Sequence, residues 1–334
     1  MRGIFVTGIN RTAILELPEP EPGPYEALVE VVACGICNST DWKIIEGEFV
    51  SGTFPILLGH EAVGRVISVG REVRSFQVGD LVLRSALRDE HVPFPGGRSC
   101  WGGFVEKAIV TDVWTEQGAG YNAFPHPQQI VPEGVAPTHA PAMIPLKEAI
   151  YCLGSTDVQP GRSLAIVGTG PVAQALTFVA NLSDVHPLVV FGRRAEWAER
   201  FARLGADGYV AGSDWPPEAR EILERGGFDR AIEAVGSRVA LDRCLEVISQ
   251  DGRVNVYGVA PESEPYLPDQ MSDPRVFRPG VAEAEAHDTL VRWIAEGRVD
   301  LSDWISHQMP WTDYRRGFDM VHDKTANRVI LTFG

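Results

Sequence analysis

The segment Leu164-Ala165-Ile166-Val167-Gly168-Thr169-Gly170-Pro171-Val172-Ala173 decides the fold of this chain, because it joins a short apolar strand to a helix. The run Leu164–Val167 predicts a buried strand, and the apolar run Ala175–Leu182 predicts the helix that follows. Glycines at the junction let the backbone approach a pyrophosphate, and the helix N-terminus favours its negative charge. The G-x-G-x-x-A pattern therefore predicts a dinucleotide site, with an ordinary strand-to-helix turn as the alternative. The residues expected to contact the cofactor are Gly168, Gly170, Pro171 and Val172.

The next predicted strand, Leu188–Phe191, ends in residues that indicate which cofactor binds. In an NAD site, an acidic residue near this point usually binds the ribose 2′-hydroxyl. Here Gly192 is followed by Arg193 and Arg194 instead, and a guanidinium binds phosphate through a planar pair of donors. We therefore predict NADP rather than NAD. The alternative is that both arginines only begin the solvated helix expected over Ala195–Leu204.

Strands and helices continue to alternate beyond this point. We predict strands over Arg230–Ala234 and Arg253–Tyr257, with a helix over about Val239–Ile248 between them. Such alternation is typical of a parallel, doubly wound sheet. This part of the chain is therefore predicted to be an α/β domain.

The N-terminal part of the chain has a different pattern. Short runs rich in β-branched residues at Ala27–Val32, Ala62–Val69 and Asp80–Leu83 lie between Gly and Pro turns. They predict an irregular, β-rich domain. A last strand is expected over Arg328–Phe333, and because no helix links it to the parallel sheet, we expect it to pair within the first domain.

Cys37, His60 and Glu61 are candidate metal ligands, and the last two lie in the stretch Gly59-His60-Glu61. Thiolate, imidazole and carboxylate together form a plausible zinc shell. Zinc held by three protein ligands keeps one position open, where a substrate hydroxyl can bind and become more acidic. For the His-Glu pair alone, the alternative is a surface turn, or a core histidine whose hydrogen bonds are made within the protein.

Length and composition restrict the class of protein. With 334 residues, 44% of them hydrophobic and 22% charged, the chain is typical of a globular enzyme with two domains. A formal net charge of −15 disfavours nucleic acid and anionic membranes as partners. Without a signal-like start or an apolar run that could span a membrane, we expect a cytoplasmic protein. Five scattered cysteines disfavour a disulfide framework.

A set of motifs occurs in a fixed order along the chain: Cys34-Gly35-Ile36-Cys37, Gly59-His60-Glu61, Val78-Gly79-Asp80, Gly102-Gly103-Phe104, Gly168-x-Gly170-x-x-Ala173 and Glu233-Ala234-Val235-Gly236. In this order they resemble the zinc-dependent medium-chain dehydrogenase/reductase family, which contains alcohol and polyol dehydrogenases. The resemblance covers nearly the whole chain. It implies an α/β protein in which residues 1–144 and 284–334 form a GroES-like β-barrel catalytic domain, with a Rossmann dinucleotide-binding domain over residues 145–283.

The resemblance also implies roles for individual side chains. Cys37 and His60 would be zinc ligands, and Glu61 either a third ligand or a carboxylate just behind the metal. Ser39 falls where the family places the hydroxyl that touches the substrate oxygen and accepts its proton. Its alternative role is to cap the helix that follows. The resemblance further implies a homodimer or homotetramer.

The chain departs from the family pattern at several positions. Where many members carry a further cysteine or acidic ligand, this chain has Ile144 or Pro145, so that water or Glu148 would complete the shell. Trp42 stands where several relatives use a histidine to pass the proton to water. A second, structural zinc is not expected, because the corresponding lobe has Cys100 alone.

These observations predict a zinc-dependent NADP(H) oxidoreductase that interconverts a secondary alcohol and its ketone. The resemblance favours a small polyol, sugar or cyclitol-like substrate. Two alternatives stay open: a zinc-free quinone or enoyl reductase of the same superfamily, which has no need of the predicted ligands, and a nucleotide-binding relative without turnover.

Overall fold

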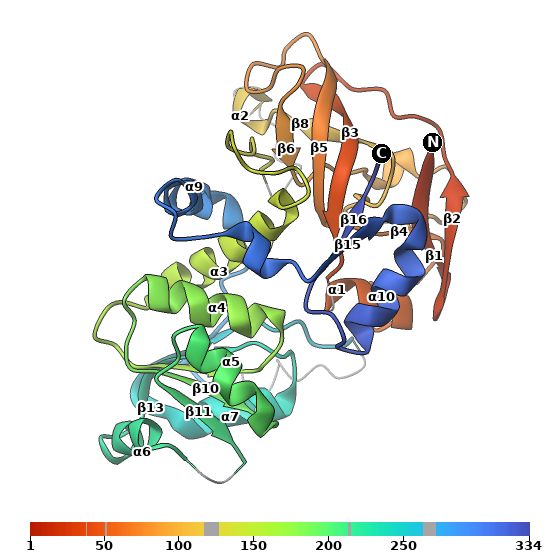
Figure 1. The fold of residues 1–334 in the computed structure, drawn as a ribbon. Coiled ribbons are helices and arrows are strands. Elements are labelled where there is room, and N and C mark those ends of the chain that lie inside the picture. The colour runs from red at the N-terminus through yellow and green to blue at the C-terminus, as the bar shows by residue number, and fades with distance from the viewer. Residues whose placement is uncertain (38, 51, 117–126, 213–214, 263–271) are drawn as a thin grey trace. The chain divides into compact units, whose positions relative to one another are not determined.

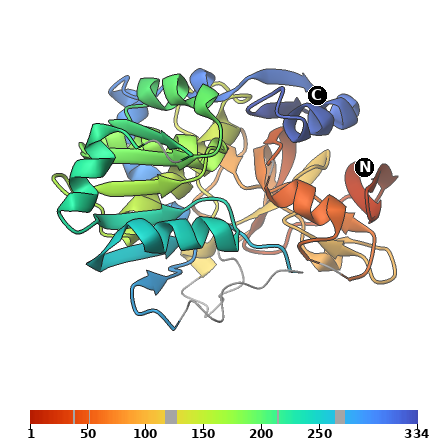
Figure 2. The same cartoon turned by 90° about the horizontal axis from the view of Figure 1, so that it is seen from below.

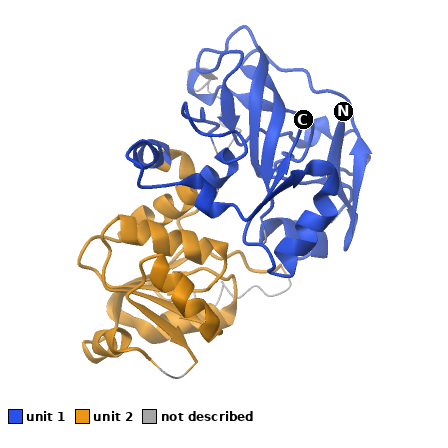
Figure 3. Cartoon of the chain, viewed as in Figure 1, with its two compact units in different colours: residues 1–144, 287–334 blue, residues 145–286 orange. Residues whose placement is uncertain are grey.

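The computed structural model describes the chain except residues 38, 51, 117–126, 213–214 and 263–271. It divides into two compact units (Figure 3): unit 1 contains residues 1–144 and 287–334, and unit 2 contains residues 145–286. Among the described residues, no helix has the length and apolar character needed to cross a membrane.

Unit 1 is built mainly of strands (Figure 1). One sheet has the order β15-β16-β3-β5-β6, with β8 also paired to β3, and another has the order β2-β1-β4-β7. The strands are β1 Arg2–Gly8, β2 Arg11–Glu16, β3 Glu26–Gly35, β4 Ile56–Leu57, β5 Glu61–Val69, β6 Leu81–Leu83, β7 Arg98–Ser99, β8 Lys107–Thr111, β15 His307–Pro310 and β16 Val329–Thr332. The helices are α1 Thr40–Glu46, α2 Val113–Glu116, α9 His287–Ala295 and α10 Tyr314–His322, and the 3-10 turns are η1 Asp89–His91, η3 Ala140–Ala142, η6 Leu301–Trp304 and η7 Trp311–Asp313.

Strand β3 determines which parts of unit 1 come together. Seven of its ten residues are buried, and it pairs with other strands along both edges. At its end, Gly35 is opposite Glu61 of β5 on one side and Ile330 of β16 on the other, both antiparallel. The last strand therefore pairs within the first unit, as predicted. This register brings the residues that follow β3, the first residue of β5 and the residue before β16 close together.

Unit 2 contains one parallel sheet in the order β11-β10-β9-β12-β13-β14. Figure 2 shows helices on both faces of this sheet. The elements are α3 Met143–Ser155, which starts just before the unit, β9 Leu164–Val167, α4 Pro171–Leu182, β10 Leu188–Gly192, η4 Ala195–Trp197, α5 Ala198–Arg203, β11 Gly208–Ala211, α6 Pro217–Glu224, β12 Phe228–Glu233, α7 Arg238–Val247, β13 Ile248–Val256, β14 Val276–Phe277 and η5 Glu283–Ala286. The predicted doubly wound sheet is confirmed.

The strand order of unit 2 reverses between β9 and β12. In open α/β sheets, ligands bind beyond the carboxyl ends of the strands at such a reversal, where the connections run to opposite faces. The Gly168–Ala173 motif follows β9 directly and opens α4, so it lies at this point. The predicted helix over Ala195–Leu204 begins with a 3-10 turn, a common feature of helix N-termini.

Candidate functional site

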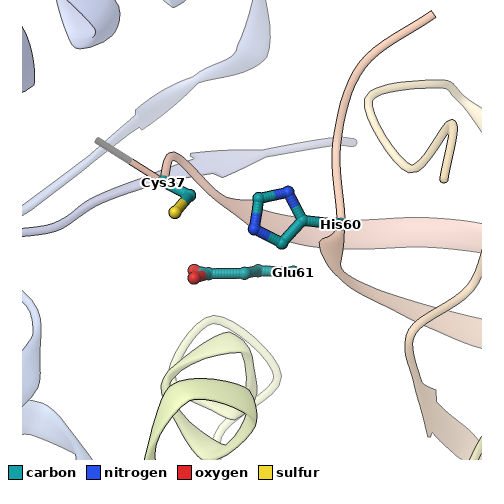
Figure 4. Close-up of side chains that lie close together, drawn as sticks. All are labelled: Cys37, His60 and Glu61. Atoms are coloured by element: carbon teal, nitrogen blue, oxygen red, sulfur yellow. The ribbon is translucent and has the colours of Figure 1, made fainter. Parts of the chain in front are cut away.

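The ligand atoms of Cys37, His60 and Glu61 lie within 4.8 Å of one another in unit 1 (Figure 4). Within the described part of the chain, this is the one group of three such side chains that could hold a metal ion. Glu61 is buried with 3% of its surface exposed, and the His60 side chain is 10% exposed. The structure therefore brings together all three predicted ligands.

The backbone around the cluster is shaped by two glycines. A Cβ atom at Gly35 would lie 2.2 Å from Glu61 Oε2, so only a glycine at the end of β3 leaves room for this carboxylate. Gly59 has φ of 104°, and a Cβ atom there would lie 2.4 Å from the backbone nitrogen of Phe104. Glycine adopts this conformation without a steric cost. These positions hold His60 and Glu61 at the start of β5.

Asp41 supports the cluster from helix α1, and the sequence analysis did not identify it. It is fully buried, and its Oδ2 accepts a hydrogen bond from the Cys37 backbone nitrogen at 2.9 Å. Its Oδ1 lies 3.4 Å from His60 Nδ1, and within the described residues neither atom has a hydrogen-bond partner. The signal in the sequence was an acidic residue one helical turn after the candidate thiolate.

The charges of Cys37 and His60 depend on each other. Burial lowers the pKa of His60, but the Asp41 carboxylate and the Cys37 thiolate outweigh burial and raise it well above its usual value. Burial raises the pKa of the Cys37 thiol, but His60 outweighs burial, and the net pKa is lowered. The pair therefore favours a thiolate beside an imidazolium, and a bound cation could take the place of the proton that they share.

Arg328, which the sequence analysis also missed, contacts the other side of Glu61. Its Nη1 donates to Glu61 Oε2 across a separation of 267 residues. Arg328 is 7% exposed and stands just before β16, which the register places beside the end of β3. A buried carboxylate needs such a partner, because an unpaired charge inside a protein is costly. The arginine leaves Glu61 Oε1 available for another contact.

This donor set fits zinc. Sulfur, imidazole nitrogen and carboxylate oxygen are ligands of catalytic zinc sites, and such sites keep one position open. With His60 Nδ1 directed towards Asp41, the other ring nitrogen is the one left for a metal. A histidine that binds a metal usually donates its remaining N–H to a carboxylate, and this contact would use both unpaired atoms, His60 Nδ1 and Asp41 Oδ1.

Ser39 lies beside the cluster and is exposed. Its Oγ is 3.4 Å from Cys37 Sγ. The residue occupies the N-cap position of α1, but its side chain makes no capping hydrogen bond to the described residues. The hydroxyl is therefore directed to the ligand cluster rather than to the helix.

Three positions that depart from the family pattern have other contacts. Ile144 is fully buried, and its hydrocarbon side chain has no atom that could bind a metal. Glu148 Oε2 accepts a hydrogen bond from the Tyr257 hydroxyl at 2.9 Å within unit 2. Trp42 of α1 donates its indole N–H to the carbonyl of Phe318 in α10 at 3.1 Å, and its ring also packs against the Phe318 ring. Its only polar hydrogen is engaged there, and the side chain cannot relay a proton.

The nucleotide motif of unit 2 is formed mainly by backbone. Gly168 has φ of 140°, and a Cβ atom there would lie 3.1 Å from the Ala234 carbonyl oxygen. Gly170 is the N-cap of α4 and Pro171 its first residue, followed by Val172. Since the first amides of a helix lack partners within it, this end is suited to a phosphate.

The end of β10 carries the two predicted arginines before the 3-10 turn η4, and both are exposed. A Cβ atom at Gly192 would lie 2.1 Å from the Tyr209 hydroxyl, which donates to the Arg194 carbonyl at 2.8 Å. Arg194 lies 3.5 Å from a Glu196 carboxylate oxygen and 5.2 Å from the centre of the Trp197 ring. For Arg193, the described part of the chain provides no ion-pair partner. Of the two, Arg193 is the more available cation.

Two family models match the chain. The model of the alcohol dehydrogenase GroES-like domain matches residues 23–117, and the model described as zinc-binding dehydrogenase matches residues 171–279. Together with the parallel sheet of unit 2, these matches confirm the predicted combination of a GroES-like and a Rossmann domain.

Individual proteins are similar along most of their length. An L-threonine 3-dehydrogenase of Anaeromyxobacter dehalogenans is 27% identical over 331 residues, covering 96% of this chain and 94% of that protein. The NADP-dependent isopropanol dehydrogenase of Thermoanaerobacter brockii is 27% identical over 276 residues, covering 77% and 76%. Among solved structures, the alcohol dehydrogenase TADH from Thermus sp. ATN1 has a TM-score of 0.79 at 25% identity, with 100% of both chains covered.

Proposed function

We propose that this chain, which belongs to the zinc-type medium-chain alcohol dehydrogenase family, interconverts a secondary alcohol and its ketone with NADP(H) as hydride carrier. Membership of this family supports an alcohol oxidoreductase in general. The observation that carries the zinc-dependent reaction is the convergence of Cys37, His60 and Glu61. A zinc-free reduction of an activated double bond has no use for these ligands.

The proposed metal ligands are Cys37, His60 and Glu61, with the last shared between the metal and Arg328. Glu61 Oε2 accepts from Arg328, and Oε1 can bind the ion. A zinc ion there would act as a Lewis acid on the substrate oxygen and favour loss of the hydroxyl proton. Asp41 would hold the proton of His60 Nδ1 and so fix the ring, while Arg328 offsets part of the negative charge of the ligands.

Ser39 is proposed to accept the substrate proton. A short hydroxyl can both donate and accept, so it can pass a proton without carrying charge itself. Ser39 is exposed and lies 3.4 Å from Cys37 Sγ, so the proton can leave it directly to water. Since the indole of Trp42 is engaged elsewhere, the relay proposed for this chain is short.

NADP is the proposed cofactor. The residues proposed to bind it are Gly168, Gly170, Pro171, Val172, Arg193 and Arg194. Two exposed guanidiniums at the end of β10 suit a ribose 2′-phosphate, and no acidic side chain occupies residues 192–194 to bind a free 2′-hydroxyl. The isopropanol dehydrogenase among the similar proteins also uses NADP.

The proposed substrates are small secondary alcohols of the polyol, sugar or cyclitol type, and the proposed assembly is a homodimer or homotetramer. Isopropanol and the hydroxyl at position 3 of L-threonine, which two similar proteins name, are both secondary alcohols. No nucleic acid or membrane partner is proposed, because the net charge of −15 repels anionic surfaces.

The test is a turnover assay on zinc-loaded protein. NADP or NAD is added with 2-propanol, 2,3-butanediol, L-threonine, cyclohexanol or myo-inositol, and formation of the reduced cofactor is followed by absorbance. We expect activity with at least one alcohol and NADP, and none in Cys37→Ser, which should also lose zinc while keeping its fold. NADPH-dependent reduction of a quinone by zinc-depleted protein at the same rate as by loaded protein would contradict the proposal.

A further inference from the structure

The segment Cys100–Phe104 runs beside the residues that lead into His60. Its backbone donates to that stretch at three points: Cys100 N to Leu57 O at 2.8 Å, Gly103 N to Gly59 O at 2.7 Å and Phe104 N to Leu58 O at 2.9 Å. A Cβ atom at Gly103 would lie 2.5 Å from Ala62 Cβ, so the two backbones are in direct contact. Any side chain on this segment therefore has a fixed position relative to the ligand cluster.

Trp101 has a backbone conformation that is unfavourable for its type. Its φ is 64°, and Gly102 after it has φ of 63°. Glycine and asparagine adopt this region readily, whereas for a bulky residue it is a genuine outlier. Such outliers persist where the surroundings impose them, and they occur preferentially at functional sites. The Trp101 carbonyl accepts from Leu87 N at 3.0 Å, which helps to hold the turn.

The Trp101 side chain faces the metal cluster and is only partly buried. Its ring centre lies 5.2 Å from that of His60, with the ring planes inclined at 49°. Within the fully described segment Cys100–Val105, every other residue is buried. Part of the indole packs against the hydrophobic core of unit 1, and the rest stays exposed. Here a strained backbone presents part of an aromatic surface beside a proposed metal ligand.

We propose that Trp101 contacts the substrate and selects secondary alcohols that carry a ring, such as alicyclic alcohols and cyclitols. This inference rests on the function proposed above and narrows its substrate class. The C–H-rich face of a six-membered ring can lie flat against an indole and exclude water from a large shared area. A carboxylate in the same place would lose its hydration without a partner.

The test compares Trp101→Asn with Trp101→Phe in the zinc-loaded protein. Asparagine tolerates a positive φ, so Trp101→Asn should unfold at the same temperature as the unmodified protein or a higher one, and keep its zinc. The ratio of kcat/KM for cyclohexanol to that for 2-propanol should fall about tenfold in Trp101→Asn, as expected for loss of an apolar contact. Trp101→Phe keeps a flat ring and should retain most of this preference.

A second measurement separates this inference from the proposed function. Binding of cyclohexanol to the zinc-loaded protein is measured by calorimetry in the presence of NADPH, which cannot accept a hydride from the alcohol, and Trp101→Asn should bind it about tenfold more weakly. Absence of turnover together with this difference in binding would contradict the proposed reaction and support the contact. An unchanged rate ratio, equal binding by both proteins, or a loss of zinc in Trp101→Asn that lowers both rates alike would overturn the role of Trp101.

Discussion

The candidate metal site of unit 1, formed by Cys37, His60 and Glu61, and the candidate nucleotide site of unit 2 are built in opposite ways. The cluster combines the buried Glu61 with the partly buried Cys37 and His60, and charged partners from other parts of the chain balance it, as Arg328 balances Glu61. The nucleotide end uses backbone amides, glycines and exposed arginines that lie within one short stretch of sequence. Without a ligand, these two arginines are exposed to water.

This difference predicts different consequences of substitution. Removing one member of a buried, paired group leaves its partner unpaired and costs free energy of folding. Removing an exposed guanidinium leaves no buried charge unpaired, so the protein loses only the contact between that group and the ligand. We therefore expect changes around the metal to affect stability and metal binding together, and changes at the end of β10 to affect cofactor affinity alone.

The largest expected effect is that of Arg328→Met. It leaves the Glu61 carboxylate buried without its counter-charge, and the free energy of unfolding should fall by about 3–5 kcal/mol. Urea unfolding followed by circular dichroism measures this change. A matched control is Arg203→Met, which removes an exposed arginine 2.7 Å from Glu199 and should cost less than about 1 kcal/mol. Equal losses in the two variants would show that the contrast between the regions is wrong.

Metal affinity should distinguish a ligand from a residue that orients a ligand. In Asp41→Asn, one of the two acceptor oxygens becomes an NH2 group, so the contact with either the Cys37 N–H or the His60 Nδ1 proton is lost together with the negative charge. Zinc affinity should therefore fall about 10–100-fold. Glu61→Gln removes a proposed ligand and should weaken zinc binding more than Asp41→Asn does. Competition with a chelator gives both values. If Glu61→Gln retained zinc as well as the unmodified protein, Glu61 would lie behind the metal rather than on it.

At the nucleotide end, the two arginines should differ. Each charge-assisted contact to a phosphate contributes on the order of 1.5–3 kcal/mol, so Arg193→Ala should weaken NADP binding at least about tenfold. Arg194→Ala should have a smaller effect, because Arg194 already contacts Glu196 and Trp197. Calorimetric titration with NADP and NAD measures both, with urea unfolding as a control for stability. Equal affinity of the unmodified protein for the two cofactors would refute the NADP prediction.

The smallest effect concerns thiol reactivity in metal-free protein. Because His60 lowers the pKa of the Cys37 thiol, iodoacetamide should modify Cys37 at lower pH than an ordinary thiol of pKa about 8.5. Burial raises the pKa values of Cys100 and Cys152 to about 12, so both should stay unmodified over that range. The rate at Cys37 should rise with pH and level off above its pKa. Peptide mapping identifies the modified residue, and an unshifted profile would contradict the pairing with His60.

The elements with a clear sequence pattern could be predicted, and so could the candidate ligands that the structure brings together. The strand Leu164–Val167 has the predicted bounds, because a run of apolar residues between a turn and a glycine motif has few other structures. The return of the last strand to the first unit was also predicted. The first prediction rests on the local pattern of apolar residues, and the second on the absence of a helix that would link the last strand to the parallel sheet.

The partners of the ligands could not be predicted in the same way. Arg328 becomes a neighbour of Glu61 only through the pairing of β16 with β3 and of β3 with β5, a register that no local pattern determines. Trp101 has no sequence signal that distinguishes it from a core aromatic, because its significance lies in a positive φ and in a ring contact. Tertiary pairing and backbone conformation supplied what the sequence pattern lacked.

Because unit 1 is discontinuous, the ribosome makes its two parts at different times. The stretch that carries Glu61 is synthesised before unit 2, and β16 with Arg328 only afterwards. Domains generally fold as units during synthesis, so unit 2 can be complete while the first part of unit 1 still lacks its last strand. Until then, the Glu61 carboxylate lacks its arginine partner, so the surroundings of the proposed metal ligands are completed only when the end of the chain has been made.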